Sequence, residues 1–194
     1  MEFIAKLWLP MLLSAVAVWL WALLACTILA LHKKDWKPLP NDDAFANALR
    51  PLNLLPGVYC FPYFKDFKHF NDPAFQARWN AGPNGIIHVW RASQNMGATM
   101  LLSFLVYLVA SFFIAYAGYA AMGPIVPHSK TFQVIGAMGV LAYSFAGLPN
   151  MIWFQANPRA KVTAVIDGII MGLITGAIFA ALWPATITIP GIHL

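Results

Sequence analysis

Four long apolar segments constrain this chain more than any other feature of its sequence. They cover residues 7–31, 100–122, 131–154 and 162–183. About 20 apolar residues are enough for a helix to cross the hydrocarbon core of a bilayer, and each segment reaches that length. Hydrophobic residues make up 60% of the 194 residues and charged residues only 10%, whereas soluble domains have about 25% charged residues. The sequence therefore predicts an all-α integral membrane protein with four transmembrane helices.

The first segment predicts an N-terminal transmembrane anchor, residues 1–31. A signal peptide has an apolar region of only about 7–15 residues before its cleavage site, and this segment is longer. Pro10 falls in the first turn of the expected helix, where a missing N–H costs least. We expect the anchor to remain uncleaved. The other three segments, residues 100–184, are expected to form a three-helix transmembrane unit.

The fourth apolar segment carries small residues at every fourth position: Gly168, Gly172, Gly176 and Ala180. Residues four apart lie on one face of a helix, and small residues let two helix backbones approach closely in a membrane. The stripe predicts a packing face. Packing inside this chain is the favoured interpretation, and docking against another subunit is the alternative.

The third apolar segment is interrupted near its end by Gly147 and by Pro149-Asn150. Such a break is tolerated in a membrane where neighbouring helices or polar groups satisfy the freed carbonyls. Asn150 and Gln155 are candidates for that role, or for pairing with Asp167 at a similar depth. Asp167 is the one ionisable residue that falls inside a predicted span, so it is a functional candidate by default. Its alternative is an ion pair with Arg159 or Lys161 near the start of the helix.

Between the first two segments, residues 32–99 predict a small α/β cap on the membrane surface. A helix is expected from Asp42 to about Arg50 after the N-cap residue Asn41, and a second begins at Asp72-Pro73. Residues 58–61 and 86–90 are rich in β-formers and predict short strands that can pair. A cap of this size cannot bury all of its aromatic residues. We expect some of them at the lipid headgroups or against a partner.

Basic residues predict the orientation of the chain. Ten of the twelve Lys and Arg residues fall in the cap or in the short connection before the fourth segment. They are Lys33, Lys34, Lys37, Arg50, Lys65, Lys68, Arg78, Arg91, Arg159 and Lys161. Only Lys6 and Lys130 fall on the other side. The positive-inside rule then places the cap in the cytoplasm and both termini outside. The net charge of +5 indicates contact with anionic lipid headgroups rather than with nucleic acid.

The sequence predicts no catalytic site, cofactor or metal centre. It contains no phosphate-binding glycine loop, no dinucleotide-binding motif and no nucleophile elbow. The closest approach to a metal site is His69 with Asp66 and Asp72 in a basic, aromatic loop, but metal binding is not the favoured interpretation there. The two cysteines, Cys26 and Cys60, are expected to be reduced and unpaired.

The last residues, 185–194, predict an extended tail outside the membrane. Apolar Ile187, Ile189 and Ile192 alternate with polar residues before the end of the chain. An extended arm of this pattern can dock on another subunit by strand addition. The alternative is a tail that lies back on its own short loop, with the isoleucines at the headgroups.

Two stretches, Leu148-Pro149-Asn150-Met151-Ile152-Trp153-Phe154 and Asp167-Gly168 through Leu182-Trp183-Pro184, carry a resemblance over roughly the last third of the chain. There it resembles small bacterial inner-membrane proteins of about four helices and unknown function. The large cap departs from that pattern. The resemblance implies the membrane class and no activity.

Together these features predict a non-catalytic accessory or structural subunit of a larger, energy-transducing bacterial membrane complex. It would dock through small-residue helix faces and the C-terminal tail. The alternative is a small membrane carrier or channel with a polar site near Asp167 and Asn150.

The orientation is tested by labelling single cysteines with a membrane-impermeant thiol reagent in intact cells. A cysteine introduced near Lys65 should be shielded, and one near His193 should react, because the positive-inside rule holds the cap in the cytoplasm. The reverse labelling pattern would contradict the orientation.

Overall fold

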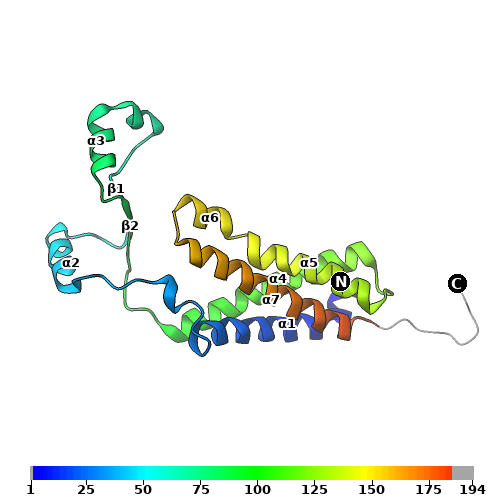
Figure 1. Cartoon of the computed structure of the whole chain (residues 1–194). Coiled ribbons are helices and arrows are strands. Elements are labelled where there is room, and N and C mark those ends of the chain that lie inside the picture. Colours follow the sequence, from blue (N-terminus) through cyan, green and yellow to red (C-terminus); the bar gives the residue numbers. More distant parts are fainter. Residues whose placement is uncertain (1, 185–194) are drawn as a thin grey trace, which may run out of the picture. The chain divides into compact units, whose positions relative to one another are not determined.

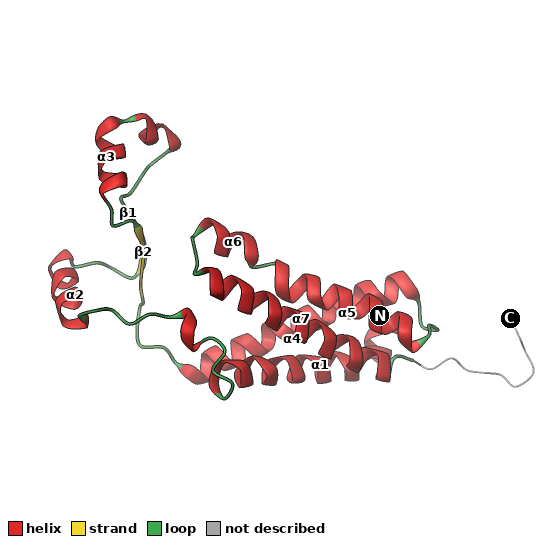
Figure 2. Ribbon diagram, viewed as in Figure 1, coloured by secondary structure: helices red, strands yellow, loops and turns green. Residues whose placement is uncertain are grey.

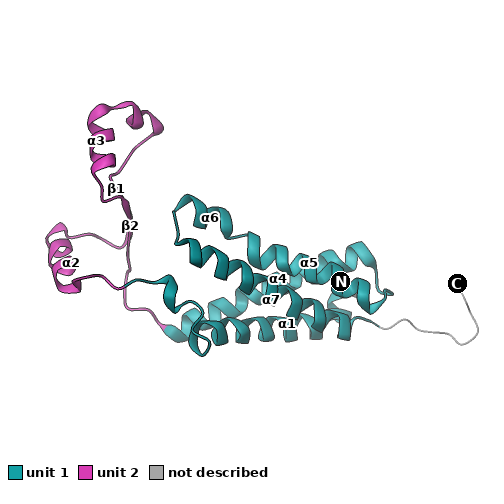
Figure 3. Ribbon diagram, in the orientation of Figure 1, with its two compact units in different colours: residues 1–37, 96–194 teal, residues 38–95 magenta. Residues whose placement is uncertain are grey.

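The computed structural model describes residues 2–184, and they form two compact units (Figure 3). Unit 1 comprises residues 1–37 and 96–194, and unit 2 comprises residues 38–95. The predicted tail residues Ile187, Ile189 and Ile192 lie outside the described residues. The first apolar segment thus belongs to the same unit as the other three.

Unit 1 is a bundle of four helices that are long and apolar enough to cross a membrane, as the sequence predicts (Figures 1 and 2). The first, second and fourth are α1 (Glu2–Thr27), α4 (Met96–Met122) and α7 (Pro158–Leu182). The third, His128–Trp153, is here called the third span. It consists of α5 (His128–Val140), the π-helical turn η4 (Leu141–Phe145) and α6 (Leu148–Trp153).

α1 ends four residues before the predicted boundary at Leu31. The apolar run continues beyond Thr27, but the N–H groups of Ile28 and Leu29 both donate to Leu24 O, at 3.1 and 2.9 Å. Ala30 then adopts a left-handed conformation with φ 48°. Such a residue ends a helix and turns the chain. Hydropathy cannot detect this turn, which places His32 beside α7.

The break in the third span involves other groups than those predicted. α5 passes into η4 at Leu141, and the hydroxyl of Ser144 donates to Val165 O of α7 at 3.2 Å. The Asn150 side chain is exposed on α6 and makes no hydrogen bond within the described chain. Gln155 lies in the following turn with φ 50°. Neither residue pairs with Asp167.

The small-residue stripe of α7 lies against the third span. A Cβ atom added to Gly172 would be 2.4 Å from Val140 N, and one added to Gly168 would be 2.5 Å from Ser144 N. At Gly176 it would be 2.9 Å from the Cα of Gly136. Backbone therefore packs on backbone, and the third span covers these three glycines. Because this face is occupied within the chain, it is not a free surface for another subunit.

The remaining core of unit 1 lies between α1, α4, α5 and α7. Its buried residues are Leu7, Met11, Ile114, Ala115, Val126, Ile135, Phe179 and Trp183. α1 and α4 also share a buried hydrogen bond of 2.6 Å between the hydroxyls of Ser14 and Ser111. The two buried hydroxyls thus satisfy each other between α1 and α4.

Unit 2 contains the predicted strands, and they pair. β1 (Gly57–Phe61) and β2 (Gly85–Val89) are antiparallel, with Gly57 opposite Val89 and Phe61 opposite Gly85. The helices are α2 (Asp42–Leu49) and α3 (Pro73–Ala81), with short 3₁₀ turns η2 (Arg50–Leu52) and η3 (Phe67–Asn71). The N-caps are as predicted, since Asn41 accepts from Ala44 N at 2.8 Å and Asp72 from Ala74 N at 3.0 Å.

Replacing Gly172 by leucine should destabilise the bundle by about 1–3 kcal/mol, the usual cost of overpacking. The matched control is Gly147→Leu, because a Cβ at Gly147 meets no atom within 4 Å. The free energy of unfolding of both variants in mixed micelles tests this. Equal stability of the two variants would contradict the packing of α7 on the third span.

Candidate functional site

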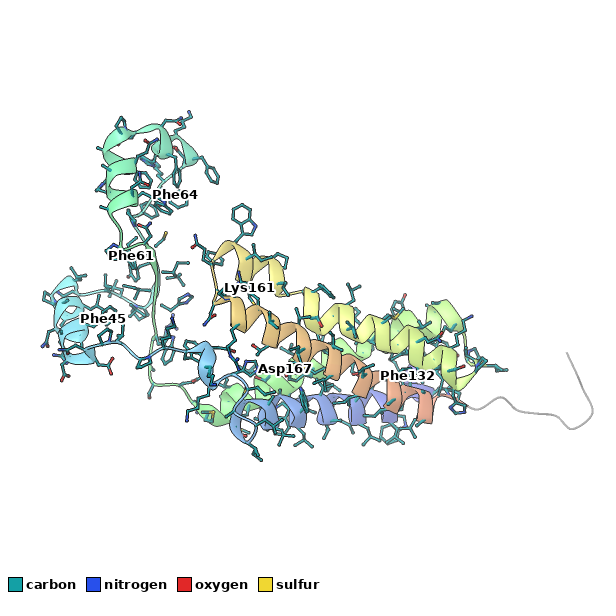
Figure 4. All side chains as sticks on the ribbon, in the orientation of Figure 1. Phe45, Phe61, Phe64, Phe132, Lys161 and Asp167 are labelled. Atoms are coloured by element: carbon teal, nitrogen blue, oxygen red, sulfur yellow. The ribbon has the colours of Figure 1, made fainter. Side chains whose placement is uncertain are left out.

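A group of polar side chains lies where α1 ends and α7 begins; Asp167 is labelled in Figure 4. The members come from three segments of unit 1: α1, the short 3₁₀ turn η1 (Lys33–Asp35) with its N-cap residue His32, and α7. We call them the polar cluster: Trp21, His32, Asp35, Arg159, Thr163 and Asp167.

His32 lies between two carboxylates at the centre of the polar cluster. Its Nε2 is 2.5 Å from Oδ2 of Asp167, and its Nδ1 is 2.9 Å from Oδ2 of Asp35. A neutral imidazole has one N–H donor, whereas an ionised carboxylate can only accept. Both contacts are hydrogen bonds only if the ring is an imidazolium or if one carboxyl is protonated. The geometry therefore requires one more proton than a neutral histidine and two carboxylates carry.

Each carboxylate has further partners. Trp21 Nε1 donates to Asp167 Oδ1 at 3.2 Å, and Thr163 Oγ1 donates to Asp35 Oδ2 at 3.1 Å. Arg159 Nε lies 3.4 Å from Asp35 Oδ1. That oxygen is buried and accepts no hydrogen bond, so the contact is an ion pair only. With an imidazolium at the centre, two positive charges balance two negative charges.

Arg159 also joins α7 to the end of α1. Its guanidinium donates to the carbonyl of Leu31 at 3.2 Å. This carbonyl lies just beyond the left-handed turn at Ala30, where the chain has left the helix. The side chain therefore holds the turn and Asp35 together.

Burial differs within the polar cluster. The side chains of Asp35 and Asp167 are 7% and 11% exposed, whereas that of His32 is 27% exposed. Burial alone would lower the pKa of His32, but hydrogen bonds to Asp35 and Asp167 outweigh it and raise that pKa above its ordinary 6.5. Burial alone would raise the pKa of Asp35, but hydrogen bonds from His32 and Thr163 and the charges of His32 and Arg159 lower it below 3.8.

One face of α7 supplies half of the polar cluster. Arg159, Thr163 and Asp167 recur every fourth residue, so they point the same way along the helix. Asn157 caps this helix by accepting from Arg159 N at 3.0 Å, and Pro158 occupies its first turn. The glycine stripe is the neighbouring face. α7 thus presents polar side chains towards α1 and a flat backbone surface towards the third span.

The predicted partners of Asp167 were wrong, because its carboxylate contacts Trp21 and His32 instead. Arg159 pairs with Asp35 instead, and Lys161 forms no ion pair among the described residues. His32 and Asp35 are not among the predicted site residues, because His32 and Asp167 are separated by 135 positions. Two local patterns could have indicated the members of the polar cluster: the four-residue spacing on α7, and the His–Asp pair just after an apolar span. Neither pattern indicates that these two groups meet.

His69 and His88 in unit 2 have structural or surface positions. His69 Nδ1 accepts from Lys65 N at 3.0 Å, and Asp66 and Asp72 accept hydrogen bonds at the starts of η3 and α3. His88 is exposed on β2. Among residues 2–184, no three His, Cys, Asp or Glu side chains are arranged to hold a metal ion. Cys26 and Cys60 are both free thiols.

No protein-family model, curated protein or solved structure matches this chain. The resemblance to four-helix bacterial membrane proteins therefore stays a prediction. The Thr163 hydroxyl lies 3.1 Å from Asp35 Oδ2 and equally far from the backbone carbonyls of Arg159 and Ala160, so its single proton can serve only one of the three acceptors. The arrangement can hold a proton on the imidazole of His32, between the carboxylates of Asp35 and Asp167.

Proposed function

We propose that this chain is a non-catalytic accessory subunit of a larger bacterial inner-membrane complex, and that unit 2 carries its docking surface in the cytoplasm. The observation that carries the proposal is the incomplete core of unit 2. Among residues 38–95, Phe75 alone is buried. A folded unit with so little core is stabilised by what it binds.

The small core of unit 2 is an aromatic cluster around Phe75. Phe70 lies 5.1 Å from Phe75 and 5.2 Å from both Phe64 and Trp79, measured between ring centroids. The guanidinium of Arg78 lies 5.9 Å from the ring centroid of Phe75. These contacts hold α3 to the η3 turn. They do not extend to the strands or to α2.

Large apolar side chains of unit 2 remain uncovered. They are 66–78% exposed at Val58 (66%), Trp90 (72%), Tyr63 (75%), Leu55 (76%) and Phe67 (78%). Single exposed apolar residues are ordinary, but several on so small a unit mark an interaction surface. The basic residues of the same unit would add attraction to anionic headgroups without covering these side chains.

The sheet of unit 2 also has unpaired edges. Among residues 38–95, β1 and β2 pair only with each other, so each leaves its outer backbone groups without a strand. A two-stranded sheet alone is marginally stable in water, and an open edge is a template for another strand. A protein partner that covers Leu55, Val58 and Trp90 fits both features.

The carrier alternative receives less support from the same geometry. A transport path near Asp167 and Asn150 needs both side chains to face one passage. Asp167 is instead bonded to His32 and Trp21, and Asn150 is exposed on α6. The third span covers the glycine face, so the proposed docking surfaces are unit 2 and the predicted tail.

Purification of the full chain from native membranes in a mild detergent, followed by mass spectrometry, tests the proposal. Defined partners should be retained in stoichiometric amounts. The double variant Leu55→Gln/Trp90→Gln should lower their retention at least about tenfold, since each large apolar side chain contributes about 1.5–3 kcal/mol when buried.

The matched control is Lys65→Gln/Asn80→Gln, which changes two exposed polar side chains of the same unit and should retain the partners. Recovery of the wild-type chain alone, with no stoichiometric partner, would refute the accessory-subunit proposal. Equal retention by both double variants would place the docking surface elsewhere.

A further inference from the structure

We propose that His32, Asp35 and Asp167 form a proton-binding site that fastens residues 28–35 to α7 when a proton is bound and releases them when it leaves. The proposal does not depend on the accessory-subunit role. It rests on the position of one imidazole between two buried carboxylates and on the connections that this imidazole makes.

The bound proton is needed to satisfy both carboxylates. With the proton, the two ring N–H groups donate to Asp167 at 2.5 Å and to Asp35 at 2.9 Å. Without it, one ring nitrogen presents a lone pair to a carboxylate oxygen. A buried carboxylate that faces a lone pair loses a donor and gains repulsion, which is costly. Proton loss and separation of the groups are therefore coupled.

The other titratable and charged groups around the site do not take over this role. Arg159 on α7 is permanently charged and is paired with Asp35. Cys26 on α1 and Tyr107 on α4 are near enough to Asp167 to interact electrostatically, but a thiol and a phenol are ordinarily neutral at pH 6–8. Lys33 and Lys34 are the basic residues of η1 beside the site. His32 is the group at this site that titrates near neutrality.

The proton would control the attachment of one short segment. Residues 28–35 touch α7 through the imidazole, through Asp35 to Thr163 and Arg159, and through the Leu31 carbonyl. Two of these contacts use Asp35, which the imidazole holds in place. Backbone N–H groups of Ile28, Leu29 and Leu31 donate to Leu24 and Ala25 of α1, so the segment stays tied to α1, but its attachment to α7 depends on the polar cluster. The segment therefore acts as a latch.

The direction of the pH dependence follows from the two shifted groups. The pKa of His32 is raised above 6.5, so its contribution is complete below 6.5 and is lost as the pH rises through the higher folded value. The pKa of Asp35 is lowered below 3.8, so its contribution is lost only as the pH falls through that lower value. The latch is closed in the weakly acidic range and opens on the alkaline side of it.

The first test is a histidine titration by NMR. The full chain, labelled with ¹⁵N at histidine and held in nanodiscs of zwitterionic lipid, gives ring signals that are assigned to His32 by their loss in His32→Gln. At pH 6.5 more than half of His32 should carry both ring protons, and Asp167→Asn should lower the titration midpoint. Asp43→Asn, an exposed carboxylate on α2, is the matched control and should leave it unchanged.

A wild-type His32 that is mostly neutral at pH 6.5 would overturn the site. A midpoint that does not move in a folded Asp167→Asn protein would also overturn it. If Asp167→Asn does not fold, the same comparison is made with Asp35→Asn.

The second test measures hydrogen exchange of residues 28–35, corrected for the intrinsic effect of pH. Exchange in the wild type should rise as the pH passes the His32 midpoint, whereas His32→Gln should exchange rapidly at every pH. Wild-type protection that stays constant across the midpoint would overturn the latch, even if the proton binds.

Discussion

The close approach of α7 to the third span is the constraint on which the rest of unit 1 depends. Gly168, Gly172 and Gly176 leave no room for a Cβ, since added atoms would lie 2.4–2.9 Å from the backbone of the facing helix. In a membrane, packing of this kind replaces the hydrophobic effect as the source of helix association. Because the glycine face of α7 is fixed against the third span, the direction of the neighbouring polar face is fixed as well. The face with Arg159, Thr163 and Asp167 is then turned towards the end of α1, where the polar cluster forms.

The polar cluster shows how charge is accommodated at the end of an apolar helix. An isolated carboxylate among apolar spans is costly, yet Asp167 accepts hydrogen bonds from Trp21 and His32, and Asp35 lies by Arg159. A protonated His32 makes the four charges balance. The same arrangement makes the balance depend on one proton, so a structural contact becomes sensitive to pH. Unit 2 differs, because several of its large apolar side chains remain exposed within residues 38–95.

Local sequence patterns predicted much of this structure. They did not predict the contacts between residues that are far apart in the chain. The four apolar segments, the Asn41 and Asp72 caps and the two strands follow from composition and spacing within a few residues. The end of α1 was misplaced because Leu31 is apolar while the turn depends on the φ of Ala30. The role expected of Asn150 was wrong because its side chain is exposed on α6 and bonds neither to a carbonyl at the break nor to Asp167. The pairing of His32 with Asp167 could not be predicted, because no local pattern relates residues 135 positions apart.

A double-mutant cycle between His32 and Asp167 tests the central claim most directly. The free energy of unfolding is measured at pH 6 for the wild type, His32→Gln, Asp167→Asn and the double variant. A hydrogen bond between charged groups contributes about 1.5–3 kcal/mol, so the two single effects should exceed the effect of the double variant by roughly that amount. Additive effects, with a coupling energy within about 0.3–0.5 kcal/mol of zero, would contradict a direct bond between the end of α1 and α7.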